Sequence, residues 1–258
     1  MYKFFRNIGL ILIVITSFIY TERLTNVVKE YDDIMVDIKE NKSLFETKPI
    51  EAKIVKNTII PGLNGRVIDI DKSYKKMREY GKYNEDLFVY KKISPKDKLN
   101  DNIDKYVIKG NKKNKVAIIL TNLNDIDSIL KYNQKFSFYI TNSWYEENKE
   151  KAITLVDEGY TLLSNDNKYI KKILGQKNGY CYVEDYNKDI LKKCKKNDDY
   201  TIIPSIIIKD NSLINLEKSI DSGSIITIKI KNPENVIKYI ISKGYEIVSL
   251  EELLDEDI

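Results

Sequence analysis

Residues 224–249 read SIITIKIKNPENVIKYIISKGYEIVS, and this stretch decides the fold. The apolar run at 224–230 predicts a buried strand, 233–242 predicts a helix, and 246–249 predicts a second strand. A strand, a helix and another strand in this order indicate parallel strands joined by a right-handed crossover. The stretch therefore indicates an α/β fold.

The same alternation of short apolar runs and helical patterns extends back to residue 116. Further strands are expected at 116–120, 136–140, 161–163 and 202–208, and further helices at 126–132, 146–158, 167–174 and 213–219. Gly159 is the expected stop of the second of these helices. Alternation of this kind implies a mostly parallel sheet, as in an open α/β sheet or a β/α barrel.

The segment 49–112 is expected to form a small α+β subdomain that precedes this sheet. Its expected elements are a hairpin over 54–70 that turns at 60–65 (IPGLNG), a helix at 73–80 with Gly81 as C-cap, and a strand at 87–93. Proline and two glycines supply the turn geometry of the hairpin.

The N-terminus carries an export signal. Residues 7–21 contain no charged side chain, and Lys3 and Arg6 precede them. A cleaved signal peptide and an uncleaved membrane anchor both fit such a run. Phe18, Ile19 and Tyr20 are bulky where a signal peptidase requires small residues, which favours an anchor over 1–21. Positive charge before the run then predicts a single-pass protein of the cell membrane whose remainder is extracytoplasmic.

Residues 22–48 are expected to form one amphipathic stalk helix. Its apolar residues recur at spacings of four and three, which defines a seam of Leu24, Val28, Tyr31, Met35 and Ile38. Such a seam could pair two copies as a homodimer or dock on the helix of another membrane protein. The alternative is a helix that folds back on its own domain, since two heptads are too few for a credible coiled coil.

Composition excludes several functions. Forty-three Lys and Arg oppose thirty-nine Asp and Glu along the chain, so the basic face that nucleic-acid binding requires is not indicated. The sequence contains no histidine, which removes the commonest metal ligand and every histidine-dependent mechanism. Cys181 and Cys194 could pair in an oxidising compartment or be two unrelated thiols, and they make a poor zinc site.

The phrases KVAIIL at 115–120, FSFYITNSW at 136–144 and VIKYIISKGYEIVSLEELL at 236–254 resemble the polysaccharide deacetylase, or NodB-homology, family in their order and spacing. This family is also called carbohydrate esterase family 4. The resemblance spans about residues 115–255 and implies an irregular β/α barrel over 113–258. It also implies that each phrase occupies the place of a barrel strand or helix of that family.

Active members of that family hydrolyse acetyl groups on glycans with a metal held by one Asp and two His, a second Asp as base and a further His as acid. The resemblance places Thr121 and Asn122 at the paired aspartates, Asn165 at the first metal histidine and Lys229 at the acid histidine. A shifted register would keep one carboxylate at Asp125. The resemblance therefore implies no catalytic residue, no bound metal and no cofactor.

The sequence predicts a non-catalytic, deacetylase-like envelope protein in wall synthesis, division or sporulation. Its expected partners are peptidoglycan or another envelope glycan, or membrane-bound envelope proteins. The positions that replace the family's active site are candidates for binding, and Trp144 and Tyr180 are candidates for stacking on sugars, with core packing as their alternative. A second hypothesis is a divergent deacetylase or glycan hydrolase that uses carboxylates such as Asp125, Asp166 or Glu184. A third is a regulator whose stalk and membrane helix carry the function.

Overall fold

The computed structural model describes residues 2–124, 126–165, 179–210 and 214–257. The chain forms two compact units, one made of 1–48 and 65–93 and the other of 49–64 and 94–258. The expected 49–112 subdomain is therefore wrong as a single body. Strand pairing explains the division, because 58–60 joins a sheet of the second unit while 65–68 pairs with 90–93 in the first.

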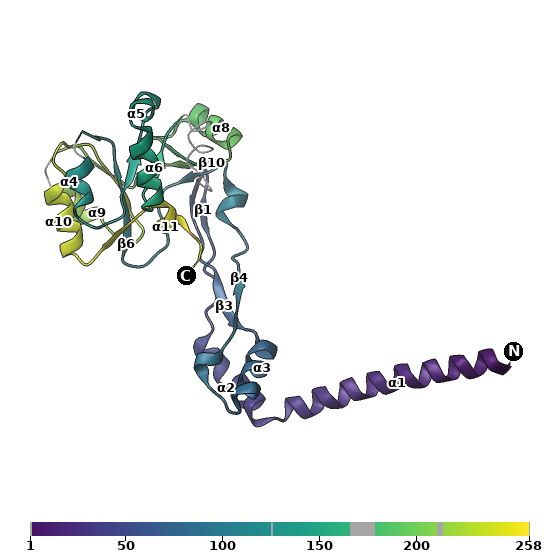
Figure 1. Ribbon diagram of the computed structural model, residues 1–258. Helices are drawn as coiled ribbons and strands as arrows, with labels where there is room; N and C mark the ends of the chain where they lie inside the picture. Colours follow the sequence, from purple (N-terminus) through teal and green to yellow (C-terminus); the bar gives the residue numbers. More distant parts are fainter. Residues whose placement is uncertain (1, 125, 166–178, 211–213, 258) are drawn as a thin grey trace. The chain divides into compact units, whose positions relative to one another are not determined.

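The first unit contains three α-helices and a two-stranded sheet (Figure 1). Its elements are α1 (Tyr2–Glu30), α2 (Asp33–Phe45), β3 (Gly65–Ile68), α3 (Ile70–Tyr80), the 3-10 turn η1 (Glu85–Leu87) and β4 (Tyr90–Ile93). Strands β3 and β4 pair antiparallel. Gly81 ends α3 in the left-handed conformation at φ 93°, which confirms the expected C-cap. The strand expected at 87–93 begins only at Tyr90.

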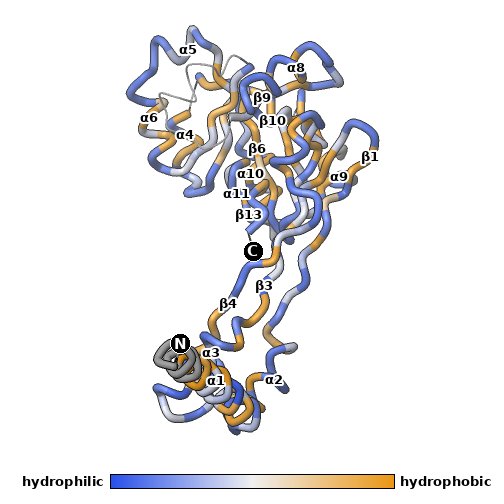
Figure 2. Tube along the Cα trace, turned by 90° about the vertical axis from the view of Figure 1, so that its right-hand side faces the viewer, coloured by the Kyte–Doolittle hydropathy of each residue, from blue (hydrophilic) through white to orange (hydrophobic). Residues whose placement is uncertain are grey.

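Helix α1 carries a run of apolar residues, which the hydropathy colouring shows in orange (Figure 2). Its segment Ile11–Glu30 is 20 residues long with a mean hydropathy of 1.4, which is long and apolar enough to cross a membrane. The helix continues without a break past the expected end of the anchor at residue 21.

The expected stalk helix over 22–48 is broken after Glu30. Asp32 provides the N-cap of a new helix, since its Oδ1 accepts a hydrogen bond from the Ile34 amide at 3.0 Å. Its Oδ2 accepts a second one from the Tyr74 hydroxyl at 3.1 Å. The residues after this cap therefore leave the line of α1.

The break also divides the predicted seam. Met35 and Ile38 are buried in α2 and pack with Tyr74 and Met77 of α3 in the core of the first unit. Leu24, Val28 and Tyr31 stay exposed. A five-residue seam on one helix is thus wrong, and the folded-back alternative holds for its second half.

The second unit begins with a hairpin, but not at the expected place. Strands β1 (Lys53–Val55) and β2 (Thr58–Ile60) pair antiparallel, and the turn falls at Lys56, whose φ is 53°. The expected turn at 60–65 is wrong, because this segment lies antiparallel to the residues at the start of the second unit. A Cβ on Gly62 would lie 2.4 Å from the Ile50 carbonyl oxygen, so glycine is needed for this close approach.

A six-stranded parallel sheet forms the larger layer of the second unit. Its order is β11-β12-β6-β7-β8, with β13 also paired to β6. The strands are β6 (Lys115–Leu120), β7 (Ser137–Tyr139), β8 (Thr161–Leu163), β11 (Ile206–Ile208), β12 (Ile225–Ile228) and β13 (Glu246–Val248). The helices between them are α4 (Ile126–Leu130), α5 (Asn142–Glu147), α6 (Lys149–Asp157), α9 (Ile214–Ser219) and α10 (Glu234–Ser242), and α11 (Leu250–Leu254) follows the last strand. The predicted α/β class with parallel strands is confirmed.

A second sheet has the order β1-β2-β5-β10-β9. It adds β5 (Tyr106–Val107), β9 (Gly179–Tyr182) and β10 (Asp199–Ile202), with the turn η2 (Leu99–Asn102) and helix α8 (Lys188–Lys196) beside them. The two sheets approach at β8 and β9, where the Ser164 amide donates to the Tyr180 carbonyl at 3.0 Å. Their strands belong to two separate hydrogen-bonded sheets in the described residues.

Two expected elements differ in length or continuity. The strand expected at 202–208 is two strands, because Pro204 interrupts it and Ser205 donates its amide to the Ile225 carbonyl at 2.8 Å. The helix expected at 146–158 is divided into α5 and α6, which meet at Asn148. The helix expected at 167–174 lies outside the described residues.

The core of the second unit lies on both faces of β6. Val116, Ile118 and Leu120 belong to a cluster on one face, and Ala117 and Ile119 to a cluster on the other. Alternate side chains of a strand point to opposite faces, so β6 is buried on both. The second cluster also contains Tyr180, Tyr182, Tyr200, Ile202 and Ile225, which come from both sheets.

Cys181 and Cys194 form a disulfide that joins β9 to α8. Both cysteines are buried, at 1% and 0% exposure. Of the two alternatives for these residues, a disulfide or two unrelated thiols, the structure contains the disulfide. The bond fixes a surface helix to the strand beneath it.

We expect the double substitution Cys181→Ala/Cys194→Ala to destabilise the second unit. The sequence separation is 13 residues, and opening a loop of this size costs about 3 kcal/mol through the entropy of the unfolded chain. Urea unfolding of the full-length protein in detergent, followed by the fluorescence of Trp144, measures the change. Dithiothreitol should lower the midpoint of the wild type and leave that of the double variant unchanged. Equal midpoints for both proteins would contradict the prediction.

Candidate functional site

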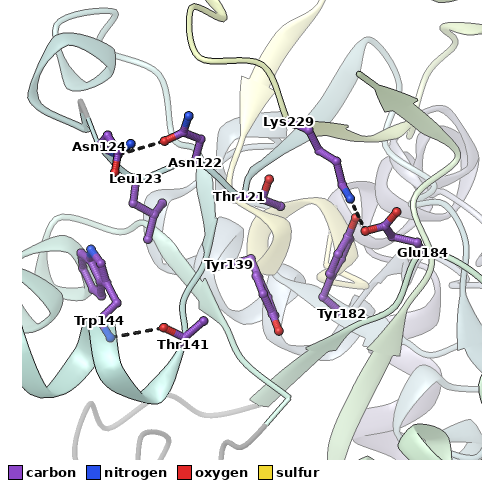
Figure 3. A pocket seen from close by; sticks show the side chains of 10 residues that line it. All are labelled: Thr121, Asn122, Leu123, Asn124, Tyr139, Thr141, Trp144, Tyr182, Glu184 and Lys229. Carbon is purple, nitrogen blue, oxygen red and sulfur yellow. Dashed lines mark hydrogen bonds and ion pairs between the residues drawn. The ribbon is translucent and has the colours of Figure 1, made fainter. Parts of the chain in front are cut away.

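A cleft of about 590 Å³ opens at the carboxyl ends of β6, β7, β9 and β12 in the second unit. Figure 3 shows the ten side chains that line it: Thr121, Asn122, Leu123, Asn124, Tyr139, Thr141, Trp144, Tyr182, Glu184 and Lys229. In parallel α/β sheets, this edge is where ligands bind. The cleft is thus the candidate site by position as well as by shape.

Thr121 and Asn122 follow directly after β6, which places them at the cleft. The Thr121 hydroxyl donates to the Ile228 carbonyl on β12 at 3.4 Å. The Asn122 Oδ1 accepts from the Asn124 amide at 3.2 Å, a local turn contact that holds the loop after the strand. Neither side chain is a carboxylate, so the end of this strand supplies hydrogen bonds and no negative charge.

Asn165 lies just beyond β8 and is tied to the neighbouring strand. Its Oδ1 accepts from the Tyr182 amide at 2.8 Å. It lines an adjoining hollow of about 390 Å³ that shares Tyr139, Tyr182 and Glu184 with the main cleft. The structure therefore brings Asn165 to the same groove as Thr121 and Asn122, although not to the same wall.

Lys229 follows β12 and forms an ion pair with Glu184, which follows β9 (Figure 3). Their side chains are 31% and 41% exposed. An ammonium group has no lone pair and cannot ligate a metal. The pair therefore leaves this end of the cleft with one positive and one negative charge that offset each other.

Aromatic rings form the remaining wall. Trp144 is partly buried near the start of α5, where its amide donates to the N-cap hydroxyl of Thr141 at 3.2 Å. The rings of Tyr139 and Tyr182 lie 5.3 Å apart at an interplanar angle of 49°. Trp144 thus lies on the cleft, and its contact with a sugar stays a prediction.

Tyr180 does not reach the cleft. It is 2% exposed and packs at 5.9 Å from the ring of Tyr200, so the core-packing alternative holds for it. Tyr182, two residues further along the same face of β9, takes the expected place. The position of Tyr182 at the carboxyl end of its strand is the sequence signal that distinguishes the two tyrosines.

Carboxylates are scarce in the groove. Asp125 and Asp166, which the alternative hydrolase hypothesis names, lie outside the described residues. Glu184 is paired with Lys229. Among the described residues, no group of three His, Cys, Asp or Glu side chains could hold a metal ion.

The phenols of the cleft are held in their neutral form. Burial raises the pKa of Tyr182 to about 12, the Glu184 carboxylate acts in the same direction, and the Thr227 hydroxyl opposes them. Burial also raises the pKa of Tyr139. Both phenols therefore remain hydrogen-bond donors throughout the neutral range.

This burial predicts a loss of stability at alkaline pH. Below the ordinary pKa of 10.0 Tyr182 is neutral in both the folded and the unfolded chain, and above it the unfolded chain ionises first. Stability should fall as the pH rises from the ordinary pKa of 10.0 to the folded pKa of about 12. Tyr200, whose pKa burial also raises to about 12, adds to the fall.

Urea unfolding at a series of alkaline pH values checks this prediction. Tyr182→Phe should reduce the slope of the free energy of unfolding against pH by up to one proton. Tyr31→Phe, at a side chain that is 81% exposed, is the matched control. An unchanged slope for Tyr182→Phe would contradict the prediction.

No family model matches the chain. In sequence, the chain is 27% identical over 140 residues to the uncharacterized protein YlxY of Bacillus subtilis (strain 168), a match that covers 51% of this chain and 44% of YlxY. The chain thus spans less than half of the length of this relative.

In structure, the chain is similar to BA3943 of Bacillus anthracis, described as a CE4 family pseudoenzyme. The two share 21% identity with a TM-score of 0.62, over 88% of this chain and 96% of BA3943. A BA3943 mutant described as having restored enzymatic activity matches with the same TM-score of 0.62 over 99% of its chain. These likenesses confirm the expected α/β class with parallel strands. The chain has a deacetylase-like fold similar to that of a CE4 pseudoenzyme, and its histidine-free sequence cannot supply the family's metal triad.

Proposed function

We propose that this protein is a non-catalytic, membrane-anchored glycan-binding module. The observation that carries the proposal is the cleft at the strand ends, which is lined by hydroxyl and amide groups, aromatic rings and one Glu184–Lys229 ion pair where the family has its metal chemistry. Sugars present hydroxyl groups at their edges and apolar faces that stack on aromatic rings. The lining matches both features.

The size and charge of the groove support a chain-like, largely uncharged ligand. The main cleft and the adjoining hollow share Tyr139, Tyr182 and Glu184, so a ligand can extend from one into the other. The single lysine and single glutamate of the main cleft offset each other. A mutant of BA3943 is described as having restored activity. An active mutant must admit its substrate, so the cleft of a CE4 pseudoenzyme can keep a shape that accepts one.

The glycan in this proposal is peptidoglycan or another envelope polymer, and the process is wall synthesis, division or sporulation. The finer architecture belongs to the same proposal, in which the two sheets of the second unit together form the irregular barrel. The Ser164 to Tyr180 hydrogen bond, which joins β8 to β9, supports it.

Two independent features support an extracytoplasmic location. Lys3 and Arg6 precede the apolar run, which favours a cytoplasmic N-terminus. The Cys181–Cys194 disulfide requires an oxidising compartment to form and persist. Both features support a position of the second unit outside the cell membrane, where envelope glycans lie. Leu24 and Val28 on α1 and Tyr31 just after it remain exposed and could add a contact with a second copy or with another membrane protein.

Glycan binding is tested with the full-length protein in detergent and a neutral chitooligosaccharide. The protein has one tryptophan, Trp144, and it lines the cleft, so its fluorescence should change on binding. Trp144→Phe should weaken binding about fivefold to tenfold because the phenyl ring offers a smaller stacking area than the indole, and calorimetry measures the affinity of this variant. Tyr180→Phe, in the core, is the matched control.

The same samples test catalysis. No acetate should be released with or without added Zn²⁺, because the metal ligands of the family are missing. Acetate release would favour the hydrolase alternative, and the absence of binding to both chitooligosaccharide and isolated cell-wall glycan would contradict the proposal.

The anchor is tested by placing charge in the apolar run. Ile13→Lys/Ile15→Lys should release the protein from membranes, because each lysine at the centre of a span costs about 2.5–3.5 kcal/mol. Leu44→Lys/Tyr80→Lys, at exposed side chains outside Ile11–Glu30, should leave the protein in the membrane fraction after an alkaline wash. A wild-type protein that is released by this wash, or whose mature N-terminus lies after Tyr20, would contradict an uncleaved anchor.

A further inference from the structure

Two layers of paired side chains lie across the cleft, between β9 and β12. Tyr182 is the last residue of β9 and Thr227 the last but one of β12, and Glu184 and Lys229 follow two residues further on, past the strand ends. The upper layer is the Glu184–Lys229 ion pair, which Figure 3 shows next to Tyr182. The lower layer consists of the hydroxyl groups of Tyr182 and Thr227.

The lower layer has unused hydrogen-bonding capacity. Tyr182 is 5% exposed and Thr227 is 0% exposed. Neither hydroxyl makes a hydrogen bond of normal geometry among the described residues. Each is within weak hydrogen-bonding reach of the other, since a hydrogen bond from the Thr227 hydroxyl lowers the pKa of Tyr182 against the larger effect of burial. Buried hydroxyls without partners are unfavourable, so a ligand group that satisfies both of them would gain affinity.

The upper layer can open at little cost. Its side chains are 31% and 41% exposed, and ion pairs that water reaches contribute little to stability. Lysine and glutamate side chains are also long and flexible, so both charges can turn into solvent without burying an unpaired charge. The ion pair therefore covers the two hydroxyls but can separate at little cost in free energy.

We propose that Tyr182 and Thr227 form a covered subsite for an uncharged hydroxyl or amide group, which enters when the Glu184–Lys229 pair opens. The proposal rests on the proposed function and specifies which part of the cleft recognises the ligand. Such a group donates one hydrogen bond and accepts another, as two facing hydroxyls require. A carboxylate or ammonium group does not suit the subsite, because its charge would be buried against neutral partners.

The first test removes the hydroxyls one at a time in the full-length protein in detergent. Tyr182→Phe should weaken the binding of chitotetraose about tenfold, the equivalent of one hydrogen bond, and should leave the midpoint of urea unfolding unchanged or raised. Thr227→Val should act in the same direction. A merely structural role for Tyr182 would change unfolding and leave affinity as it is, which would overturn the proposal. Tyr180→Phe is the control for loss of a buried phenol nearby.

The second test opens the cover. Raising NaCl from 50 mM to 500 mM screens the ion pair and should strengthen the binding of this neutral ligand severalfold, which is the reverse of electrostatic binding. The double variant Lys229→Met/Glu184→Gln should bind more tightly than the wild type and lose the salt dependence. Affinity that falls with salt, or that ignores both salt and the double variant, would overturn the proposal.

A small probe separates this inference from the proposed function. Acetamide at high concentration should raise the unfolding temperature of the wild type more than that of Tyr182→Phe. If acetamide raises the unfolding temperature only when Tyr182 is present and chitotetraose does not bind, the glycan function is overturned and the subsite is supported. Chitotetraose binding that is independent of Tyr182 would support the function and overturn the subsite. If neither probe depends on Tyr182 and neither binds, both are overturned.

Discussion

The burial of β6 on both of its faces is the constraint on which the second unit depends. Strand β6 pairs with β12, β7 and β13, and its side chains alternate between two apolar clusters. A strand enclosed in this way cannot slip by one residue without turning all its side chains to the wrong face. Its last residue, Leu120, is therefore fixed, and the position of Thr121 and Asn122 at the cleft follows from it.

Electrostatics explains why the cleft suits recognition better than chemistry. A catalytic metal needs several anionic or imidazole ligands that converge on one point. The described cleft has instead one carboxylate, on Glu184, and Lys229 already occupies it. The other polar groups are hydroxyls and amides, which hold their charge state over the whole physiological range. A site of this kind distinguishes ligands by shape and hydrogen bonding.

The fold could be predicted from the sequence wherever local pattern and tertiary pairing agree. The apolar runs at 115–120 and 224–230 became β6 and β12, because buried parallel strands are apolar on both faces. The pattern failed where a single residue redirects the chain. Asp32 caps a new helix and Pro204 divides a strand, and neither changes the apolar periodicity much. The split of 49–112 could not be predicted, since it depends on which distant strands β2 and β4 pair with. Of the cleft residues, the family resemblance predicted Thr121, Asn122 and Lys229. Tyr139 and Tyr182 could be assigned to the cleft only once the structure showed where their strands end.

The disulfide connects the stability of the second unit to its cleft. Cys181 and Tyr182 are neighbours on β9, so their side chains point to opposite faces of the sheet. Cys181 is bonded to Cys194 of α8, and Tyr182 belongs to the cluster between the sheets. The covalent bond on the outer face therefore restrains the strand that carries Tyr182 and Glu184 on the inner one. In its sheet, the described part of β9 pairs with β10, and on its other side it has two hydrogen bonds with Ser164 and Asn165 after β8. The strand is therefore held by few bonds on that side, and the wall of a binding cleft must stay in place, which gives the disulfide a role in positioning as well as in stability.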